Sequence, residues 1–366
     1  MTTTQTETRP ATARRPRVER ASKGVRSNGA AAKRAAPSEP RRALTTATTT
    51  QTLLVASAGG HLDELWLLRS RLSGITDDVT WVTSDTPQSR ALLDGERRIF
   101  VPWAAPRDVL ATVSNTRQAQ RVLASGRWSQ VISTGSLHAV PFMALARARG
   151  IPCHFIDSAT RVDGPSVSAR LLERVPGVRL YSQYEGWERE GWSYRGSVFD
   201  GFEPQDRPAQ PLRRVVVALG ANRYGFRRLV DAVRAALPRG ASVLFQTGTT
   251  DVSDVPDEPG VTWQPFVGGD ALFDAMRQAD LVVAHAGVGT ALTAMRAGHA
   301  PVLVARRAEH DEHVDDHQLQ VVAALEEAGL AIATTADALC RDLLTTATAR
   351  RVVRSDAPGS FVLAAS

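Results

Sequence analysis

His61 stands in a glycine-rich loop that suits either proton transfer or anion binding. It follows Ser57-Ala58-Gly59-Gly60, which comes directly after the apolar run Thr52–Ala56. Glycines between a strand and a helix let backbone N–H groups approach a ligand, and the helix N-terminus adds partial positive charge. A neutral imidazole there can accept a proton from an acceptor hydroxyl. The competing interpretation, which the loop taken alone favours slightly, is a tight turn with a capping histidine.

A second polar cluster follows the apolar run His154–Ile156. It begins with Asp157 and Ser158 and ends with Arg161. Asp after a strand most often caps a helix. Asp157 is also the alternative to His61 as the base, or the group that orients it. Arg161 suits an anionic ligand or bulk solvent equally, and with Ser158 it completes our candidate acceptor-side loop.

The most specific loop is Ala284-His285-Ala286-Gly287-Val288-Gly289-Thr290, which precedes a predicted helix. Two glycines and a threonine at a helix start form a cradle of backbone amides and one hydroxyl for a diphosphate. A lone histidine at such a place is usually structural. Followed by Gly287, Gly289 and Thr290, His285 becomes a candidate contact to a diphosphate or to a donor.

The loop Gly220-Ala221-Asn222-Arg223 repeats the strand–glycine–helix pattern after the valine-rich run Arg214–Leu219. Gly220 and Asn222 are candidates for phosphate binding. An ordinary turn explains the loop equally well.

Three histidines, His310, His313 and His317, are spaced as on one face of a helix, which suggests a zinc site. None of their spacings is diagnostic, so we predict no metal. The acid-rich segment fits a helix start. Its functional interpretation is a polar rim that binds sugar hydroxyls through carboxylates and amides, namely Glu309, Asp316 and Gln318.

Short apolar runs alternate with longer amphipathic ones, which is typical of α/β proteins with parallel sheets covered by helices. The predicted strands are Thr52–Ala56, Val79–Val82, Val131–Ser133, His154–Ile156, Arg214–Leu219, Ser242–Gln246, Leu281–Ala284 and Pro301–Val304. The predicted helices are Leu62–Leu72, Asn115–Ala124, Val140–Arg149, Phe226–Leu237, Thr290–Ala297 and Val314–Ala328. This pattern predicts two similar halves, each built on an open parallel sheet, with ligands at the carboxyl ends of the strands.

A proline-rich stretch without periodicity, Phe199–Pro211, divides the two halves. We predict a basic tail at 1–50, a first domain at 51–200, a linker at 201–211 and a second domain at 212–345. Residues 346–366 form either a helix that packs back on the first half or a frayed end.

The net charge of +6 over 366 residues is carried by the start of the chain. Residues 1–50 hold 11 basic and three acidic residues (+8), and residues 51–366 hold 33 basic and 35 acidic ones (−2). The first 50 residues contain no Phe, Tyr or Trp, so we predict disorder. The near-neutral remainder argues against nucleic-acid binding. We expect no transmembrane helix, and the two cysteines fit a cytoplasmic protein.

Longer segments resemble a known family. LVASAGGHLDELWLL and FIDSATRVDG resemble the Alg14-like subunit of a two-part glycosyltransferase. RVVVALGANRYGFRRLVDAV and ADLVVAHAGVGTALTAMRAGHAPVLVARRAEHDEHVDDHQ resemble its Alg13-like partner, here fused to it. More distantly, the arrangement is similar to MurG, of glycosyltransferase family 28. The resemblance covers roughly residues 52–335 and implies a GT-B fold, two Rossmann-like domains with a cleft between them.

The resemblance also implies an activity. Such enzymes transfer a sugar with inversion from a UDP-sugar, for example UDP-GlcNAc, to an acceptor hydroxyl, usually on a polyprenyl-linked saccharide in polysaccharide synthesis. No metal or cofactor is needed, because a helix N-terminus neutralises the leaving UDP. The positions carried over are Gly59, Gly60 and His61 toward the acceptor, His285, Gly287, Gly289 and Thr290 toward the diphosphate, and Glu309, Asp316, His317 and Gln318 toward the donor's sugar or ribose.

Two other functions stay open, a UDP-sugar epimerase on the same scaffold and a non-catalytic module that binds a membrane or a partner. A lipid-linked acceptor implies peripheral contact with the inner face of the cell membrane. The basic tail suits an anionic surface. Trp103 with Arg107 and the segment Trp187–Tyr194 are candidate contact surfaces, although buried core tryptophans explain them equally well.

Overall fold

The computed structural model describes residues 50–102, 109–187, 189–220 and 223–364, all within one compact unit. The predicted basic tail lies outside the described residues except for its last residue, Thr50. Asn222, Trp103 and Arg107 also lie outside them.

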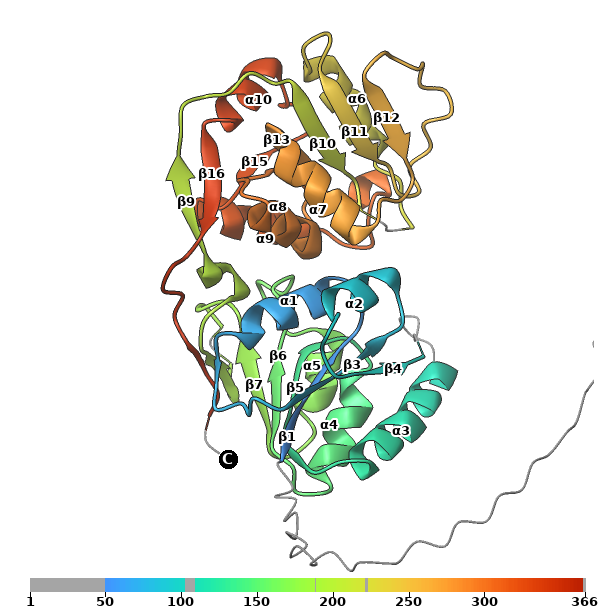
Figure 1. The fold of residues 1–366 in the computed structure, drawn as a ribbon, viewed down its shortest axis with the longest axis vertical. Helices are drawn as coiled ribbons and strands as arrows, with labels where there is room; N and C mark the ends of the chain where they lie inside the picture. The colour runs from blue at the N-terminus through green and yellow to red at the C-terminus, as the bar shows by residue number, and fades with distance from the viewer. Residues whose placement is uncertain (1–49, 103–108, 188, 221–222, 365–366) are drawn as a thin grey trace, which may run out of the picture. The chain divides into compact units, whose positions relative to one another are not determined.

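The first half is a parallel sheet of seven strands in the order β4-β3-β1-β5-β6-β7-β8 (Figure 1). Its strands are β1 Gln51–Ala56, β3 Val79–Ser84, β4 Arg98–Val101, β5 Trp128–Gly135, β6 Cys153–Ile156, β7 Val178–Ser182 and β8 Trp192–Tyr194. Its helices are α1 Gly60–Arg69, α2 Pro87–Leu92, α3 Val109–Ala124, α4 Ala139–Arg147 and α5 Val167–Leu172.

The second half is a parallel sheet of six strands in the order β12-β11-β10-β13-β14-β15. Its strands are β10 Arg214–Ala218, β11 Ser242–Gln246, β12 Val261–Gln264, β13 Leu281–His285, β14 Val302–Val304 and β15 Ile332–Thr334. Its helices are α6 Arg227–Ala236, α7 Gly269–Gln278, α8 Val288–Arg296, α9 His317–Glu327 and α10 Arg341–Ala347. All eight predicted strands and six predicted helices are present, with shifted ends.

Alternating side chains on the central strands pack against helices on opposite faces, as expected for sheets buried on both sides. In β1, Leu53 and Val55 face one apolar cluster, whereas Leu54 and Ala56 face another. In β10, Val215 and Val217 pack with α6, whereas Val216 and Ala218 belong to the cluster that holds α8.

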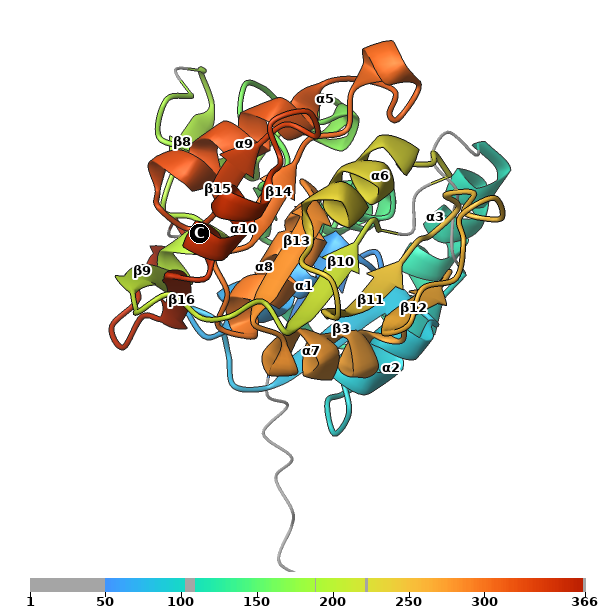
Figure 2. The same cartoon turned by 90° about the horizontal axis from the view of Figure 1, so that it is seen from above.

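Helices α1 and α8 join the two halves. Leu62 and Leu65 of α1 and Leu292 and Met295 of α8 belong to one continuous buried cluster, which reaches both sheets. Figure 2 shows α8 and α1 one above the other beneath the second sheet. The carboxyl ends of β1 and β13 lead into these two helices, so the loops with the predicted chemistry start from the same junction.

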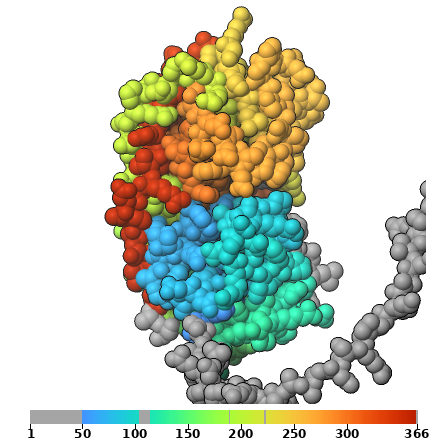
Figure 3. All heavy atoms as spheres, in the orientation of Figure 1, coloured from blue at the N-terminus to red at the C-terminus, as the bar shows by residue number. Residues whose placement is uncertain are grey.

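Two predictions about the connecting segments were wrong. The linker prediction missed β9 (Phe202–Asp206), which pairs antiparallel with β16 (Arg350–Arg354). The end of the chain returns to the first half as a strand, not a helix, because β17 (Phe361–Val362) pairs with β2 (Leu72–Ser73). Figure 3 shows this terminal segment lying against the early part of the chain. Phe361 is fully buried there, so apolar burial fixes the return.

In the aromatic segment Trp187–Tyr194 the two tryptophans pack on one another at the edge of the core, whereas Tyr194 is exposed. Trp192 lies in β8 and is buried, and its ring centroid is 4.9 Å from that of Trp187. The Trp187 indole N–H donates to the carbonyl of Val162. Among the described residues, no helix has the length and apolar character needed to cross a bilayer.

Candidate functional site

The imidazole of His61 is held at the carboxyl edge of the first sheet. Its Nδ1 lies 3.0 Å from the carbonyl oxygen of Thr134, and the Thr134 hydroxyl donates back to the His61 carbonyl at 2.6 Å. A Cβ on Gly135, which has a φ of 126°, would stand 2.9 Å from the imidazole Cε1. The end of β5 therefore fixes the ring both by hydrogen bonding and by close contact.

This contact defines the protonation of His61. A carbonyl oxygen only accepts, so Nδ1 carries the proton and Nε2 keeps its lone pair in the neutral ring. Burial lowers the pKa of His61 below its ordinary value, and nearby Arg161 and His138 act in the same direction against the raising effect of the Thr134 carbonyl. His61 is half-buried. With its lowered pKa, the imidazole is neutral at neutral pH.

Glu64, one turn after His61 on α1, ties the helix to the loop after β6. Its two carboxylate oxygens accept from the hydroxyl of Ser158 at 2.7 Å, the N–H of Ala159 at 3.0 Å and the Nε2 of Gln183 at 2.9 Å. Burial raises the pKa of Glu64 to about 7 against these hydrogen bonds. The carboxylate positions the acceptor-side loop relative to His61.

Asp157 is buried and serves its own loop. Its carboxylate accepts from the N–H groups of Ser158 at 3.0 Å and Ser166 at 2.8 Å. Burial raises its pKa. Among the described residues, the hydrogen-bond partner of the His61 ring is Thr134 and not Asp157, so the orienting role considered for Asp157 falls to a backbone carbonyl.

The N-termini of α1 and α8 converge at two glycines. A Cβ on Gly289 would lie 3.3 Å from the Cα of Gly60, and one on Gly60 would lie 3.7 Å from the Gly289 nitrogen. Neither helix has a side-chain cap, since Gly59 and Gly287 occupy the cap positions. The positive dipole ends of both helices therefore meet at one junction, and helix N-termini of this kind favour anions. The Asp63 side chain lies at the same place, since a Cβ on Gly289 would stand 3.6 Å from its Oδ2.

His285 lies beneath the loops of the second half. Its Nδ1 is 3.2 Å from the carbonyl oxygen of Ala218, and burial lowers its pKa to about 4. A Cβ on Gly220, whose φ is 76°, would stand 2.5 Å from the His285 ring, and one on Gly287 would overlap it. The ring is therefore neutral and shapes the glycine backbone.

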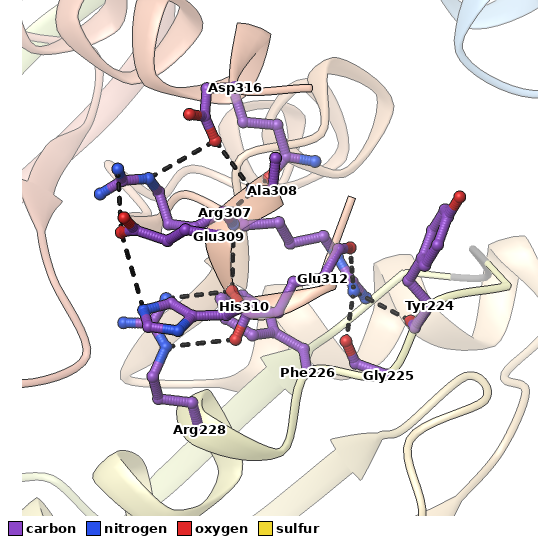
Figure 4. Close-up of polar contacts among 12 residues, drawn as sticks. Tyr224, Gly225, Phe226, Arg228, Arg307, Ala308, Glu309, His310, Glu312 and Asp316 are labelled. Atoms are coloured by element: carbon purple, nitrogen blue, oxygen red, sulfur yellow. Dashed lines mark hydrogen bonds and ion pairs between the residues drawn. The ribbon is translucent and has the colours of Figure 1, made fainter. Parts of the chain in front are cut away.

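A buried arginine connects the loop after β10 with the loop after β14. The Arg306 guanidinium donates to the carbonyls of Leu219 at 2.7 Å, Tyr224 at 2.9 Å and Gly225 at 2.8 Å. Glu312 receives a two-pronged contact from Arg228 at 3.1 and 3.0 Å and also accepts from the N–H of Arg307. Figure 4 shows this network, which holds the rim of the second half in one shape.

The predicted sugar-binding rim divides into exposed and buried members. Glu309 is exposed and pairs with Arg307 at 2.9 Å. Asp316 is partly exposed and accepts from the N–H of Ala308 at 2.9 Å, as Figure 4 shows. Gln318 is buried, and its side-chain oxygen accepts from the Arg306 N–H at 3.0 Å. Gln318 thus supports the loop from below.

The helical face predicted for the three histidines was wrong. His310 ends a short 3-10 turn, Asp311 adopts a left-handed conformation with a φ of 55°, and α9 begins only at His317. A different group forms instead. His313, Asp315 and His317 offer three ligand atoms within 4.8 Å of one another, with Asp315 Oδ1 3.2 Å from His313 Nδ1. Asp315 Oδ1 is hydrogen-bonded to His317 Nδ1, whereas the buried His313 Nδ1 makes no hydrogen bond to a residue that the structure describes.

Sequence reasoning missed Glu64, Arg306 and Glu312. Glu64 carried a signal, because it is a charged residue on the apolar face that Leu62, Leu65 and Leu68 define, and such a residue must find buried partners. No sequence signal marks Arg306 or Glu312, because many other charged residues surround them in the same polar segment.

Residues 215–354 match the C-terminal domain of glycosyltransferase family 28. Two similar proteins are UDP-N-acetylglucosamine–N-acetylmuramyl-(pentapeptide) pyrophosphoryl-undecaprenol N-acetylglucosamine transferases. The one from Synechococcus sp. (strain JA-2-3B'a(2-13)) is 25% identical over 56% of this chain and 58% of its own length. The one from Shewanella sp. (strain ANA-3) is 25% identical over 64% of this chain and 65% of its own length. The matches thus span less than two thirds of these relatives.

Solved structures show the same fold. The glycosyltransferase SnogD from Streptomyces nogalater matches with a TM-score of 0.51 and 19% identity over 82% of this chain and 91% of its own. The glycotransferase of kitacinnamycin matches with a TM-score of 0.50 and 18% identity over 82% and 89%. The predicted α/β architecture of GT-B type is confirmed.

Proposed function

Through residues 215–354 the chain is related to the MurG-type glycosyltransferases of family 28, and we propose that it is an inverting transferase. It moves a sugar from a UDP-sugar to a hydroxyl of a lipid-linked saccharide. The observation that carries this proposal is the junction of α1 and α8, where two uncapped helix N-termini meet beside the neutral, oriented imidazole of His61.

The junction supplies the two things that such a transfer needs. The N–H groups at the start of α8, around Gly289 and Thr290, stabilise the negative charge that develops on the leaving UDP. On the other side, His61 Nε2 accepts the proton of the acceptor hydroxyl. The acceptor oxygen forms a bond to the anomeric carbon as the bond from that carbon to the diphosphate oxygen breaks. A single displacement of this kind inverts the anomeric centre.

The donor's sugar and ribose lie against the rim of the second half. Glu309, Asp316 and His317 are accessible polar groups of this rim, and carboxylates bind vicinal hydroxyls well. Gln318, His285 and Gly220 hold the loops that present these groups and the diphosphate cradle. The donor sugar that we propose is N-acetylglucosamine, the sugar that both relatives are named for transferring.

The acceptor side belongs to the first half, in which the loop Asp157–Arg161 is fixed to α1 through Glu64. An Alg14-like first domain joined to an Alg13-like second domain accounts for this division. A polyprenyl-linked acceptor requires the enzyme to work at the cytoplasmic face of a membrane, as a peripheral protein. The basic tail is the segment that we assign to anionic lipid there.

Replacement of His61 by Ala tests the proposal. We expect kcat to fall about 100- to 10,000-fold, the usual cost of losing a general base, with UDP affinity unchanged. Arg239→Ala, which removes an exposed cation from the loop between α6 and β11, at the amino ends of the strands, is the control and keeps wild-type turnover. Unchanged turnover in His61→Ala would remove this residue from the mechanism.

The same assay without acceptor separates the alternative chemistry. A transferase incubated with UDP-GlcNAc alone releases at most a little UDP by hydrolysis. Formation of a different UDP-sugar would instead identify an epimerase.

A further inference from the structure

A cavity of about 700 Å³ lies on the acceptor side, away from the α1–α8 junction. The loops that leave the carboxyl ends of β6 and β7 form one wall, and the last turn of α9 forms the other. The lining residues that matter here are Val162, Asp163, Tyr184, Glu185, Trp187 and Glu327. Its volume falls within the range of small-molecule sites.

The cavity wall is joined to His61 by a chain of hydrogen bonds. The Tyr184 hydroxyl donates to the carbonyl of Ala159 at 2.6 Å, and the Ala159 N–H donates to Glu64 at 3.0 Å. Glu64 lies on α1, three residues after His61. A ligand seated in the cavity is therefore in contact with the same rigid unit that holds the proposed base.

Two aromatic rings line the cavity in fixed positions. The Trp187 indole N–H donates to the Val162 carbonyl, and the ring packs on Trp192. Tyr184 is held through its hydroxyl. The face of an aromatic ring is electron-rich, so it attracts the C–H groups on the apolar face of a pyranose.

Acidic side chains complete the walls. Asp163, Glu185 and Glu327 are exposed, and none is in an ion pair with a residue that the structure describes. The cation that lines the cavity, Arg189, is already bound to Glu173 at 2.7 and 3.1 Å. Three carboxylates repel phosphate and anionic lipid headgroups, whereas they accept hydrogen bonds from neutral hydroxyl groups.

We propose that this cavity binds an uncharged saccharide, the glycan portion of the acceptor, with Trp187 as its stacking platform. This assignment rests on the proposed function, because it gives the acceptor of that reaction its chemical class. It also explains the tryptophan-rich segment Trp187–Tyr194 without a membrane contact.

Saturation-transfer NMR on the full chain tests the assignment, with glucose, galactose and chitobiose as probes. We expect at least one of them to bind, with the strongest saturation on the protons of one ring face. Trp187→Ala should weaken that binding about tenfold, the scale of one aromatic contact. Glu327→Gln, on the opposite wall, should weaken it about threefold to tenfold by replacing a charged acceptor. Tyr194→Ala removes an exposed ring of the same segment that does not line the cavity, and it should bind as the wild type does.

Equal binding by the wild type, Trp187→Ala and Glu327→Gln would overturn the inference, as would a wild-type protein that binds none of the probes. Because Glu327 is an exposed helix residue, its substitution does not threaten folding. UDP titration of each protein runs in parallel. A wild type that binds UDP but no saccharide refutes this inference alone, whereas one that binds no UDP refutes the proposed function.

Discussion

The two halves of the molecule use the same device for different purposes. In each, a histidine at the carboxyl edge of the sheet donates its Nδ1–H to the carbonyl at the end of a neighbouring strand, Thr134 in the first half and Ala218 in the second. Each ring also lies flush against a glycine with positive φ, Gly135 or Gly220. The carbonyl hydrogen bond gives each imidazole one defined tautomer, and burial, which lowers both pKa values, keeps each ring neutral.

The halves differ in what surrounds the rings. His61 is half-buried next to the junction, whereas His285 is buried beneath Gly220 and Gly287. The half-buried neutral ring of His61 suits proton transfer. The buried neutral ring of His285 instead fixes the backbone of the glycine loop above it. Because His285 carries no charge at neutral pH, the positive field for the diphosphate that we propose there must come from helix N-termini.

Among the substitutions that compare the two halves, the largest expected effect comes from the two glycines that lie against the histidine rings. Gly135→Ala pushes the His61 ring out of place, and a misplacement of about 1 Å costs on the order of 100-fold in kcat. Gly220→Ala disturbs His285 and the donor loop, and should weaken UDP binding about tenfold. Steady-state kinetics measure kcat of both variants, and UDP titration measures their affinity for UDP. Loss of UDP affinity in Gly135→Ala would break the comparison.

A second pair of substitutions, Glu64→Ala and Glu312→Ala, compares the buried carboxylates of the two halves. Glu64→Ala leaves the hydroxyl of Ser158, the N–H of Ala159 and the amide of Gln183 without their acceptor, and should cost about 3 kcal/mol of unfolding free energy. It should also lower acceptor-dependent kcat/KM and leave UDP affinity alone.

Glu312→Ala strands the Arg228 guanidinium and should cost a similar amount, about 3 kcal/mol. Here UDP-sugar binding should suffer instead. Urea denaturation followed by tryptophan fluorescence gives both stabilities. If the two substitutions impaired the same kinetic parameter, the functional division between the halves would be refuted.

The pH dependence of kcat is a smaller effect with a definite sign. Burial lowers the pKa of His61, so the neutral base persists below pH 6.5 and kcat falls only as the pH drops through that lowered pKa. Above it, the rate levels off. The fall of kcat at low pH should persist in the Glu64→Gln variant. If it shifted or disappeared in that variant, the titrating group would be Glu64 and not His61.

The smallest expected effect is that of chelation. Treatment with EDTA should leave the transfer rate unchanged, because backbone amides at the α8 N-terminus stabilise the leaving diphosphate. Complete loss of activity that a single divalent ion restores would revive a metal site. His313, Asp315 and His317 would then be the first residues to substitute.

The elements that could be predicted from the sequence are those that a local pattern of residues encodes. Apolar runs such as Leu281–Ala284 give central strands, and glycines at their ends give the loops. Strands that exist only through distant pairing escaped it, because β9 and β17 find partners far along the chain. The helical spacing of His310, His313 and His317 misled it, since Asp311 tolerates a left-handed backbone and interrupts the helix there.

The candidate site shows the same difference between what local sequence patterns predict and what they do not. His61, Gly287 and Gly289 stand out by residue type next to a strand end, so they could be predicted. Their supports could not, because the partners of His61 and His285 are backbone carbonyls, which no residue type signals.

A crystal structure of the complex with UDP tests the central claim most directly, because both α1 and α8 present uncapped N-termini at the junction. The diphosphate should lie on the second half, with its oxygens about 3 Å from the backbone nitrogens of Gly289 and Thr290, and His61 Nε2 should remain free for the acceptor. A diphosphate bound instead to the N–H groups of Gly60 and His61 would contradict the assignment of donor and base to separate halves.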